Sequence, residues 1–367
     1  MRVLFLSWRD TSHPDGGGSE VYVEQVAAGL AARGHDVTVL CASHDGAADV
    51  SVTGGFRVLR RGGRLTVYVH GLAYLLSRAG RRTDAVVDVI NGLPFATPLV
   101  RRRGLVALVH HVHREQWRII YPGWGGRLGW YVESRVVPWL YRAIPFVTVS
   151  EASRRDLHAL GLRRVEVVRN GTPSLPAPRL PRSATPRLCV LARLVPHKRI
   201  EQAIALTDEL RERHPGLVLD LVGDGWWAGE LDAEISRRGL QGVVVRHGRV
   251  DEQTKADLLG QAWLMVLPSV REGWGIAVLE AAAVGTPTVA YRNAGGTAES
   301  VVDGTTGALV ADEASLRQIT DELLGDPRRL DALGRAARER AATFTWDEAT
   351  TGLEKVLLEE LRRGYLP

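Results

Sequence analysis

Apolar and polar positions alternate along the chain with two different periods. Residues 2–7 form a short apolar run without a helical period, and residues 36–41 form another. Between them, residues 19–33 place apolar side chains at the i, i+3, i+4 and i+7 positions of an amphipathic helix, and a glycine follows. This order predicts a strand, a helix and a second, parallel strand joined by a right-handed crossover.

The same two periods recur further along the chain and predict the remaining elements. Before residue 172 they predict strands at 56–60, 85–91, 105–110 and 146–150 and helices at 67–78, 127–141 and 152–160. After residue 186 they predict strands at 187–194, 217–223, 243–248, 263–269 and 287–291 and helices at 199–213, 228–238, 253–261 and 276–283. A final helix is predicted at 346–363, and the sequence leaves open whether it returns to the first half.

A proline-rich stretch without periodicity, residues 172–186, interrupts this alternation and predicts a linker. We therefore expect an N-terminal domain at 1–172, a linker at 173–186, a C-terminal domain at 187–343 and a C-terminal helix at 344–367. Strand–helix alternation on both sides of the linker predicts an α/β protein with two doubly wound Rossmann-like domains that face a central cleft. A ligand is expected at the carboxyl ends of the strands.

The composition is that of an ordinary globular chain, with 45% hydrophobic and 24% charged residues. Its two cysteines lie in separate predicted strands, which argues against a disulfide framework or a zinc site and favours a cytoplasmic location. No apolar run approaches the roughly 18 residues that span a bilayer. The apolar N-terminus passes directly into a polar, glycine-rich loop, so we interpret it as the first strand and not as a signal peptide.

The basic charge belongs to the first half of the chain. Residues 1–180 contain 24 arginines, no lysine and 14 acidic residues, a formal charge of +10, whereas the remainder carries −5. Only Lys198, Lys255 and Lys355 are lysines. Such a basic half is compatible with an anionic membrane surface, an acidic substrate or simply a solvated, arginine-rich surface. Nucleic acid is the least expected partner, because no recognised binding motif accompanies the charge.

The most informative stretch is REGWGIAVLE, residues 271–280, which begins between a predicted strand and a predicted helix. Gly273 and Gly275 allow the backbone to turn and to approach a ligand closely, and the free N–H groups of a helix N-terminus favour an anion. Glu272 and Glu280 flank these groups. Glu280 stands among apolar residues, and a buried carboxylate there needs a partner. The alternative interpretation is an ordinary turn followed by a solvated glutamate.

Two further loops carry candidate ligand-binding groups. Gly16, Gly17 and Gly18 precede the first helix, and such a loop can cradle a phosphate or accept a sugar, although neither a P-loop nor a dinucleotide motif is present. Arg193 and Lys198 follow the first strand of the second domain. Because the carboxyl ends of parallel strands lie at one edge of a sheet, we expect these two cations beside the glycine turn described above, where they can hold a diphosphate.

An ordered set of motifs covers nearly the whole chain: GGG (16–18), VSE (149–151), RNG (169–171), ARLVPHK (192–198), GDG (223–225), HGRV (247–250) and PSVREGWGIAVLEAAAVGTPTVA (268–290). Together these motifs resemble the retaining glycosyltransferases of family 4, which have the two-domain GT-B fold. The specific part is the E-x7-E element, Glu272 to Glu280, with its Gly-aromatic-Gly start. In this sequence Trp274 stands where phenylalanine is usual.

The resemblance implies a role for each matching position of the second domain. Arg193 and Lys198 would bind the diphosphate of a nucleotide-sugar donor, and Glu280 would bind its ribose hydroxyls. Glu272 would bind the donor sugar. The backbone positions expected around the donor's phosphate, sugar and base are Gly273, Trp274, Gly275, Ile276, Arg249 and Val250.

In the first domain, the resemblance implies that Gly16 to Gly18 close over the donor and that His110 faces the reacting sugar. The predicted catalytic residues are therefore Glu272, His110, Arg193 and Lys198. No DxD element is present, so we expect no metal and no other cofactor, with the two cations supplying the positive charge. The expected reaction moves a sugar from a nucleotide-diphosphate sugar to an acceptor hydroxyl with retention of the anomeric configuration.

Several alternatives stay open at this point. His110, His111 and His113 form HHVH, and the sequence does not decide which of them faces the sugar or whether the cluster binds a metal. Residues 117–141 interleave aromatic residues with arginines, a pattern compatible with a membrane interface, an acceptor platform or plain helix packing. An anionic inner membrane face is thus a candidate partner. A sugar-nucleotide epimerase of the same fold and a non-catalytic sugar-nucleotide sensor are the rival functions.

Overall fold

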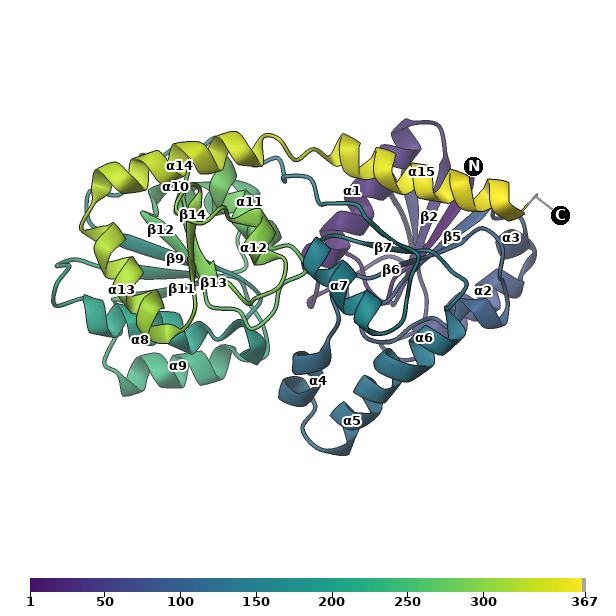
Figure 1. Ribbon diagram of the computed structural model, residues 1–367, viewed down its shortest axis with the longest axis horizontal. Coiled ribbons are helices and arrows are strands. Elements are labelled where there is room, and N and C mark those ends of the chain that lie inside the picture. Colours follow the sequence, from purple (N-terminus) through teal and green to yellow (C-terminus); the bar gives the residue numbers. More distant parts are fainter. Residues whose placement is uncertain (365–367) are drawn as a thin grey trace. The chain divides into compact units, whose positions relative to one another are not determined.

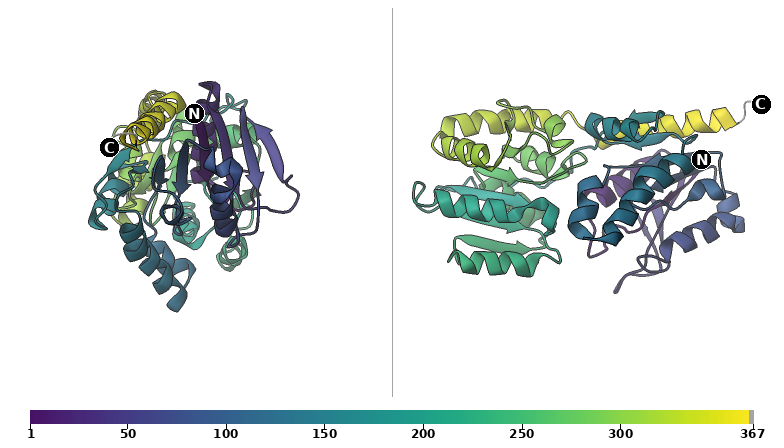
Figure 2. Two further views of the ribbon diagram at one scale, coloured as in Figure 1. Left: turned by 90° about the vertical axis from the view of Figure 1, so that its right-hand side faces the viewer. Right: turned by 60° about the horizontal axis from the view of Figure 1, so that its bottom comes forward.

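The computed structural model describes residues 1–364 and divides the chain into two compact α/β units. Unit 1 comprises Met1–Gly171 together with the C-terminal segment that begins at Thr345, and unit 2 comprises Thr172–Phe344. The proline-rich stretch 172–186 contains no helix or strand. In each unit helices cover both faces of a central sheet (Figure 1 and Figure 2).

Unit 1 is built around an eight-stranded sheet with the order β3-β4-β2-β1-β5-β6-β7-β8. Its strands are parallel except for the antiparallel pair β3 and β4. The strands are β1 (Arg2–Leu6), β2 (Asp36–Cys41), β3 (Val50–Thr53), β4 (Phe56–Arg60), β5 (Ala85–Val89), β6 (Leu105–Leu108), β7 (Phe146–Thr148) and β8 (Val165–Val167). The helical segments are α1 (Gly18–Ala32), α2 (Val67–Leu76), α3 (Arg78–Arg81), η1 (Thr97–Leu99), α4 (Arg114–Ile120), α5 (Trp124–Tyr131), η2 (Val132–Val136), α6 (Val137–Leu140), α7 (Glu151–Ala159) and α15 (Trp346–Gly364).

Unit 2 is built around a six-stranded, wholly parallel sheet with the order β11-β10-β9-β12-β13-β14. Its strands are β9 (Arg187–Leu191), β10 (Val218–Val222), β11 (Val244–Gly248), β12 (Leu264–Leu267), β13 (Thr288–Tyr291) and β14 (Gly307–Val310). Its helical segments are η3 (Pro196–Lys198), α8 (Ile200–Leu210), α9 (Ala228–Arg237), α10 (Glu252–Gln261), α11 (Ile276–Ala283), α12 (Thr297–Ser300), α13 (Glu313–Leu324) and α14 (Pro327–Ala341).

Alternating side chains of the unit 2 strands build a core on each face of the sheet. Leu188 and Val190 of β9 pack with apolar residues of α8, α9 and α13, whereas Cys189 between them packs with residues of α10 and α11. This alternation follows from the two-residue period of a strand. Both cores together bury the apolar runs that predicted these strands, as expected for a parallel sheet covered on both faces.

In both units the strand order reverses beside the first strand. In unit 1, β1 lies between β2 and β5, and in unit 2, β9 lies between β10 and β12. Loops on the two sides of such a point diverge and leave a crevice at the carboxyl edge of the sheet, where α/β proteins bind ligands. The predicted fold class, two doubly wound Rossmann-like units, is confirmed.

The C-terminal helix α15 packs on α1 and so belongs to unit 1 (Figure 1). Gly29 of α1 allows this approach, because a β-carbon there would lie 2.2 Å from the hydroxyl oxygen of Thr350. Arg33 pairs with Glu354 at 2.6 Å, and His35 Nε2 lies 2.7 Å from the same carboxylate. The structure thus places a helix whose location the sequence left open.

The predicted helix 127–141 is present as a continuous helical stretch over 124–140 that comprises three segments, α5, η2 and α6. Pro138 lies in α6 and lacks a backbone N–H, so a regular α-helical hydrogen-bond pattern cannot pass through it. The wider π-helical turn before it holds Glu133 in the interior, where this residue is 4% exposed. Three short strands, β3, β8 and β14, and five helices, α3, α4, α12, α13 and α14, are absent from the sequence prediction.

Candidate functional site

The candidate site of unit 2 lies at the switch point between β9 and β12. The loop after β12 is held from two sides by backbone hydrogen bonds. The Val270 N–H donates to the His197 carbonyl in the loop after β9 at 2.9 Å, and the Glu272 N–H donates to the Ala294 carbonyl after β13 at 2.8 Å. The Gly296 N–H donates back to the Glu272 carbonyl at 3.0 Å. These bonds fix the backbone that leads into α11.

Two glycines allow this loop to follow its path. Gly275, directly before α11, has a φ of 90°, in the left-handed region where a side chain is strained. Gly296 packs on the peptide of Gly273, because a β-carbon at Gly296 would lie 1.9 Å from the Gly273 oxygen. The glycine turn is therefore a close-packed backbone junction as well as a helix start. The ligand contacts predicted for Gly273, Gly275 and Ile276 stay predictions.

The structure brings Lys198 and Glu272 together. Lys198 ends the short turn η3 after β9, and its Nζ lies 2.5 Å from Glu272 Oε1. Both side chains are largely buried, with 15% and 13% of their surface exposed. The pair lies on the two loops that flank the switch point, next to the N–H groups that begin α11. This arrangement brings a cation to a carboxylate on the loop that leads into the N-terminus of α11.

Glu280, one turn into α11, also has a lysine partner. Lys255 of α10 places its Nζ 2.6 Å from Glu280 Oε1 and 2.9 Å from Glu252. Burial raises the pKa of Glu280, and the ammonium of Lys255 opposes that shift. Burial by itself lowers the pKa of Lys255, but the carboxylates of Glu280 and Glu252 outweigh it, so this pKa is raised. Sequence reasoning showed that Glu280 needs a partner but missed Lys255, because the pairing depends on how α10 packs against α11.

The other residues predicted to bind the donor lie at the same edge of the sheet. Arg193, which is half-buried, lies in the loop after β9, and Arg249 and Val250 directly follow β11. The loop after β9 contacts the glycine turn after β10, because a β-carbon at Gly223 would lie 2.0 Å from the Ala192 oxygen. The structure therefore places the predicted phosphate and base positions on loops of one sheet edge, and their roles stay predictions.

Trp274 belongs to the core of unit 2. Its side chain is 2% exposed, and its ring packs edge-on against Phe344 with the centroids 5.3 Å apart. Tryptophan, which stands here where phenylalanine is usual in the family, therefore anchors the glycine turn in the core of unit 2. Only the backbone of Trp274 is placed to take the role that the resemblance implies.

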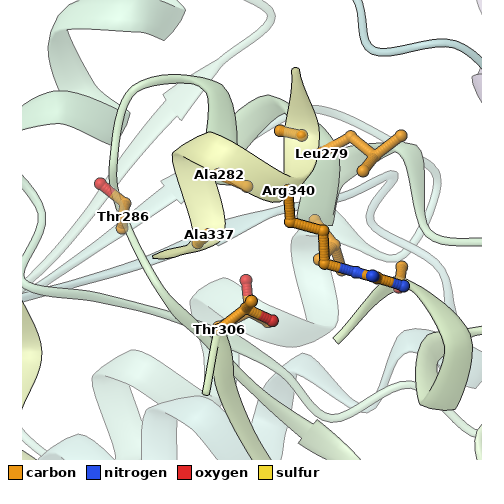
Figure 3. A pocket seen from close by; sticks show the side chains of 10 residues that line it. Leu279, Ala282, Thr286, Thr306, Ala337 and Arg340 are labelled. Atoms are coloured by element: carbon orange, nitrogen blue, oxygen red, sulfur yellow. The ribbon is translucent and has the colours of Figure 1, made fainter. Parts of the chain in front are cut away.

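Two cavities lie near these loops. A space of about 10 Å³ between α11 and α14 is lined by Leu279, Ala282, Ala337 and Arg340 among others (Figure 3). It has room for at most about one water molecule and is too small for a nucleotide. A more open groove of about 290 Å³ is lined by residues at the starts of α8 and α13 and by residues at the ends of β12 and β13, including Val270. This groove adjoins the loop that carries Glu272, and its volume approaches the lower limit for small-molecule pockets, about 300 Å³.

In unit 1 two of the predicted glycines, Gly16 and Gly17, lie between β1 and α1 at the other switch point, and Gly18 is the first residue of α1. Gly17 caps α1, and its N–H donates to the Glu20 carboxylate at 2.8 Å. Glu20 is buried and its Oε1 lies 3.0 Å from Arg9 Nε. The start of α1 is thus capped by a carboxylate of its own helix. Sequence reasoning missed Arg9 and Glu20, although a glutamate three residues after the cap residue is a recognisable capping signal.

The three histidines of HHVH have different surroundings. His111 Nε2 lies 2.9 Å from Gln116 Oε1, and His113 Nδ1 lies 2.9 Å from Glu133. His110 is 5% exposed, burial lowers its pKa to about 4, and its Nε2 has no hydrogen-bond partner within residues 1–364. Over the same residues, no three His, Cys, Asp or Glu side chains are grouped so as to hold a metal ion.

The segment 114–140 contains one buried carboxylate, Glu133, which was not among the residues predicted from the sequence. This carboxylate accepts a hydrogen bond from the Trp117 indole N–H at 2.9 Å. On the outer side, α5 and α6 expose several large apolar side chains: Trp124 (79%), Leu128 (52%), Tyr131 (58%) and Trp139 (69%). No helix in the described part of the chain, residues 1–364, has the length and apolar character needed to cross a membrane.

Comparison with known proteins defines the class of this protein. The family described as glycosyl transferases group 1 matches residues 175–340, and Glycosyltransferase Family 4 matches residues 16–174. The glycogen synthase of Mycobacterium tuberculosis is 30% identical, over all of this chain and 97% of its own length. Two doubly wound units that carry these two domains define a glycosyltransferase of the GT-B fold.

Solved structures share this fold. Sucrose-phosphate synthase from Thermosynechococcus elongatus matches with a TM-score of 0.84 at 21% identity, over 99% of both chains. Anabaena HepE in complex with UDP-glucose matches with a TM-score of 0.75 at 19% identity, over 98% of this chain and all of its own. The chain belongs to the family 4 glycosyltransferases, and the resemblance inferred from its motifs is confirmed.

Proposed function

We propose that this glycosyltransferase is a metal-independent, retaining enzyme that moves a hexose from a nucleotide-diphosphate sugar to an acceptor hydroxyl. The observation that carries the proposal is the Lys198–Glu272 pair, 2.5 Å apart beside the N-terminus of α11. Membership of family 4 supports it, and the fold neighbour HepE binds UDP-glucose, a donor of this chemical class.

In the proposed reaction, the acceptor oxygen forms a bond to the anomeric carbon while the bond from that carbon to the phosphate oxygen breaks. The acceptor's proton passes to the leaving phosphate, on the face from which the phosphate departs, so the configuration is retained. The diphosphate gains negative charge as it leaves. Lys198, Arg193 and the N–H groups that begin α11 would therefore stabilise the transition state more than the ground state.

Lys198 and Glu272 can bind one donor together. An ammonium has three N–H donors and a carboxylate has about four acceptor sites. Their mutual contact leaves other donors for phosphate oxygens and other acceptors for sugar hydroxyls. Partial burial of both side chains strengthens such contacts relative to water. Glu280 would bind the ribose hydroxyls, and the backbone at Arg249 and Val250 would flank the base.

Unit 1 would supply the acceptor side. His110 lies after β6, with its ring 5.2 Å from the ring of Tyr22. Because burial lowers its pKa to about 4, His110 is neutral near physiological pH and would hydrogen-bond a sugar hydroxyl without adding charge. The acceptor itself is proposed only by class, as a hydroxyl of a lipid, a glycan or a small natural product. Gly16 to Gly18 would contact the donor, as the family resemblance implies.

We also propose that unit 1 contacts the anionic inner face of the membrane from the cytoplasm. Trp124, Tyr131 and Trp139 are exposed beside Arg127 and Arg135. Aromatic rings and basic side chains together favour the headgroup region of a bilayer, and salt weakens the charge attraction. The protein is expected to co-sediment with anionic vesicles at low salt and to be released at high salt. Protein that stays in the supernatant at low salt contradicts this part of the proposal.

The catalytic proposal is tested by Glu272→Gln and Lys198→Ala, assayed with a panel of nucleotide sugars and acceptors. Each variant is expected to lose about 100-fold or more in turnover, the cost of removing one transition-state contact, while circular dichroism shows a folded chain. Lys355→Ala, at a side chain that is 76% exposed, is the control and should behave as the unaltered protein. Full activity in both site variants refutes the assignment. Donor conversion without an acceptor, other than hydrolysis, would instead identify an epimerase, and nucleotide binding without turnover a sensor.

A further inference from the structure

Lysine is rare in this chain, and its placement is selective. The 47 basic residues comprise 44 arginines and three lysines. Lys198 pairs with Glu272 and Lys255 pairs with Glu280, so two of the three lysines meet the two glutamates of the E-x7-E element. On α15, Lys355 lies at the surface, with its Nζ 4.0 Å from Glu359 Oε1. Arginine is the cation at nearly every other position, which indicates that these two positions select an ammonium.

Lys255 reaches Glu280 across the junction of α10 and α11. The side chains of the pair are 15% and 12% exposed, and Ala256 and Leu259 beside Lys255 are fully buried. Within residues 1–364, the charged groups that shift the ionisation of Glu280 are Lys255, which favours the carboxylate, and Glu252, which opposes it. Glu280 therefore relies on a single ammonium for compensation.

The chemistry of the two basic side chains explains why lysine suits this position. A guanidinium is a broad planar fork, whereas an ammonium is a compact point charge with three donors on a flexible stem. Two of the Lys255 contacts go to Glu280 and Glu252. A compact ammonium can make both contacts between the two packed helices, and its contact with Glu280 involves one carboxylate oxygen, Oε1.

We infer that Lys255 is a positioning residue of the donor site, whose ammonium holds the Glu280 carboxylate ionised and oriented to accept hydrogen bonds from vicinal hydroxyls of a nucleoside diphosphate. This inference rests on the proposed function and extends it to a residue on α10. Lys255 acts through Glu280 and does not touch the reacting atoms.

Removing the ammonium of Lys255 should make nucleotide binding depend on pH. Burial raises the pKa of Glu280 and Lys255 counteracts it, so Lys255→Met leaves the effect of burial unopposed. The variant carboxyl then takes up a proton at a pH where the unaltered residue is ionised, and a protonated carboxyl accepts hydrogen bonds less well. Binding should be weakest at low pH and recover as the pH rises through the raised pKa.

The experiment is isothermal titration calorimetry with UDP, ADP and GDP between about pH 6 and about pH 9. The nucleotide that the unaltered protein binds best becomes the probe. Lys255→Met is expected to raise its Kd by about tenfold or more at the low end, the loss expected for a hydrogen bond to a charged group, and to approach the unaltered value at the high end. Lys255→Arg keeps the charge, so its Kd should rise without acquiring a pH dependence. Lys355→Met is the matched control and should change nothing.

Thermal unfolding gives a second readout that needs no ligand. Lys255→Met leaves a buried carboxylate without its cation and should lower the unfolding midpoint, and adding Glu280→Gln should recover part of that loss. A Kd that Lys255→Met leaves unchanged, or raises equally at every pH, overturns the inference while the donor site stands. Failure of the unaltered protein to bind any of the three nucleotides overturns the proposed function, and the role of Lys255 with it.

Discussion

Gly296 offers a sharp test of whether the loop before α11 carries the activity. A β-carbon added at Gly296 would lie 1.9 Å from the Gly273 oxygen, 2.6 Å from the Gly273 carbonyl carbon and 2.8 Å from Trp274 Cα. These are backbone atoms and not the end of a flexible side chain. The φ of Gly296 is −64°, which any residue adopts, so the effect of Gly296→Ala would come from this contact alone.

The size of the effect follows from the distance. Because β-carbon contacts under 3.0 Å essentially never occur, the loop must move by about 1 Å. A misplacement of about 1 Å in a catalytic site can cost about 100-fold in rate. Trp274 anchors the same loop against Phe344, so the shift cannot be absorbed freely on that side. We expect Gly296→Ala to lose about 100-fold in kcat/KM for the nucleotide sugar.

The control is Gly229→Ala in the same unit. Gly229 lies in the first turn of α9, and a β-carbon there would have no neighbour within 4 Å. This variant should keep full activity and should gain slightly in stability, by about 0.5 kcal/mol, because alanine loses less entropy in a helix. Steady-state kinetics and thermal unfolding of both variants decide the outcome. If Gly296→Ala is folded and as active as Gly229→Ala, the loop before α11 is not the catalytic element.

Two further predictions concern unit 1. Leu353→Ala, at a fully buried position of α15, should lower the free energy of unfolding of unit 1 by about 2–5 kcal/mol. The control Leu358→Ala, at a position 37% exposed, should lower it by less than about 1 kcal/mol. Hydrogen exchange of unit 1 amides measures both effects, and equal effects would argue against the packing of α15 on α1. Burial raises the pKa of Asp88 despite its hydrogen bonds from Tyr141 and Thr97, so the ionised form weakens the folded state. The stability of Asp88→Asn relative to the unaltered protein should therefore improve as the pH rises from about 4 towards neutral, as denaturant unfolding would show; a difference that does not change with pH contradicts this reasoning.

Elements bounded by glycines were the most predictable. β2, β4 and α11 begin and end at the predicted residues. Glycines lie close to the ends of each, at Gly34, Gly55, Gly275 and Gly285, for example, and all four of these have positive φ angles. The helix predicted at 127–141 is present as continuous helix over 124–140, but periodicity did not predict its π-helical middle, η2, or register the missing N–H of Pro138. β14 was missed although β13, also four residues long, was predicted, because its run GALV contains glycine and alanine, which are depleted in strands.

The candidate site was predictable where it depends on local sequence and was not predictable where it depends on contacts between distant residues. Its E-x7-E stretch, its glycine turn and the cations after β9 follow from local sequence, because each depends on residues within one loop and the helix or strand beside it. The partners of its charges do not. Glu272 meets Lys198 from 74 residues away and Glu280 meets Lys255 from 25 residues away.

The family, the βα alternation and the need for a partner at Glu280 could be predicted from the amino-acid sequence, because these depend on residue type and local spacing. The sequence did not predict which lysine meets which glutamate, how Gly296 supports the glycine turn or that α15 packs on α1. Those contacts arise only when strands and helices distant in sequence pack against one another, and side-chain pairing across such a junction leaves no periodic signal in the chain.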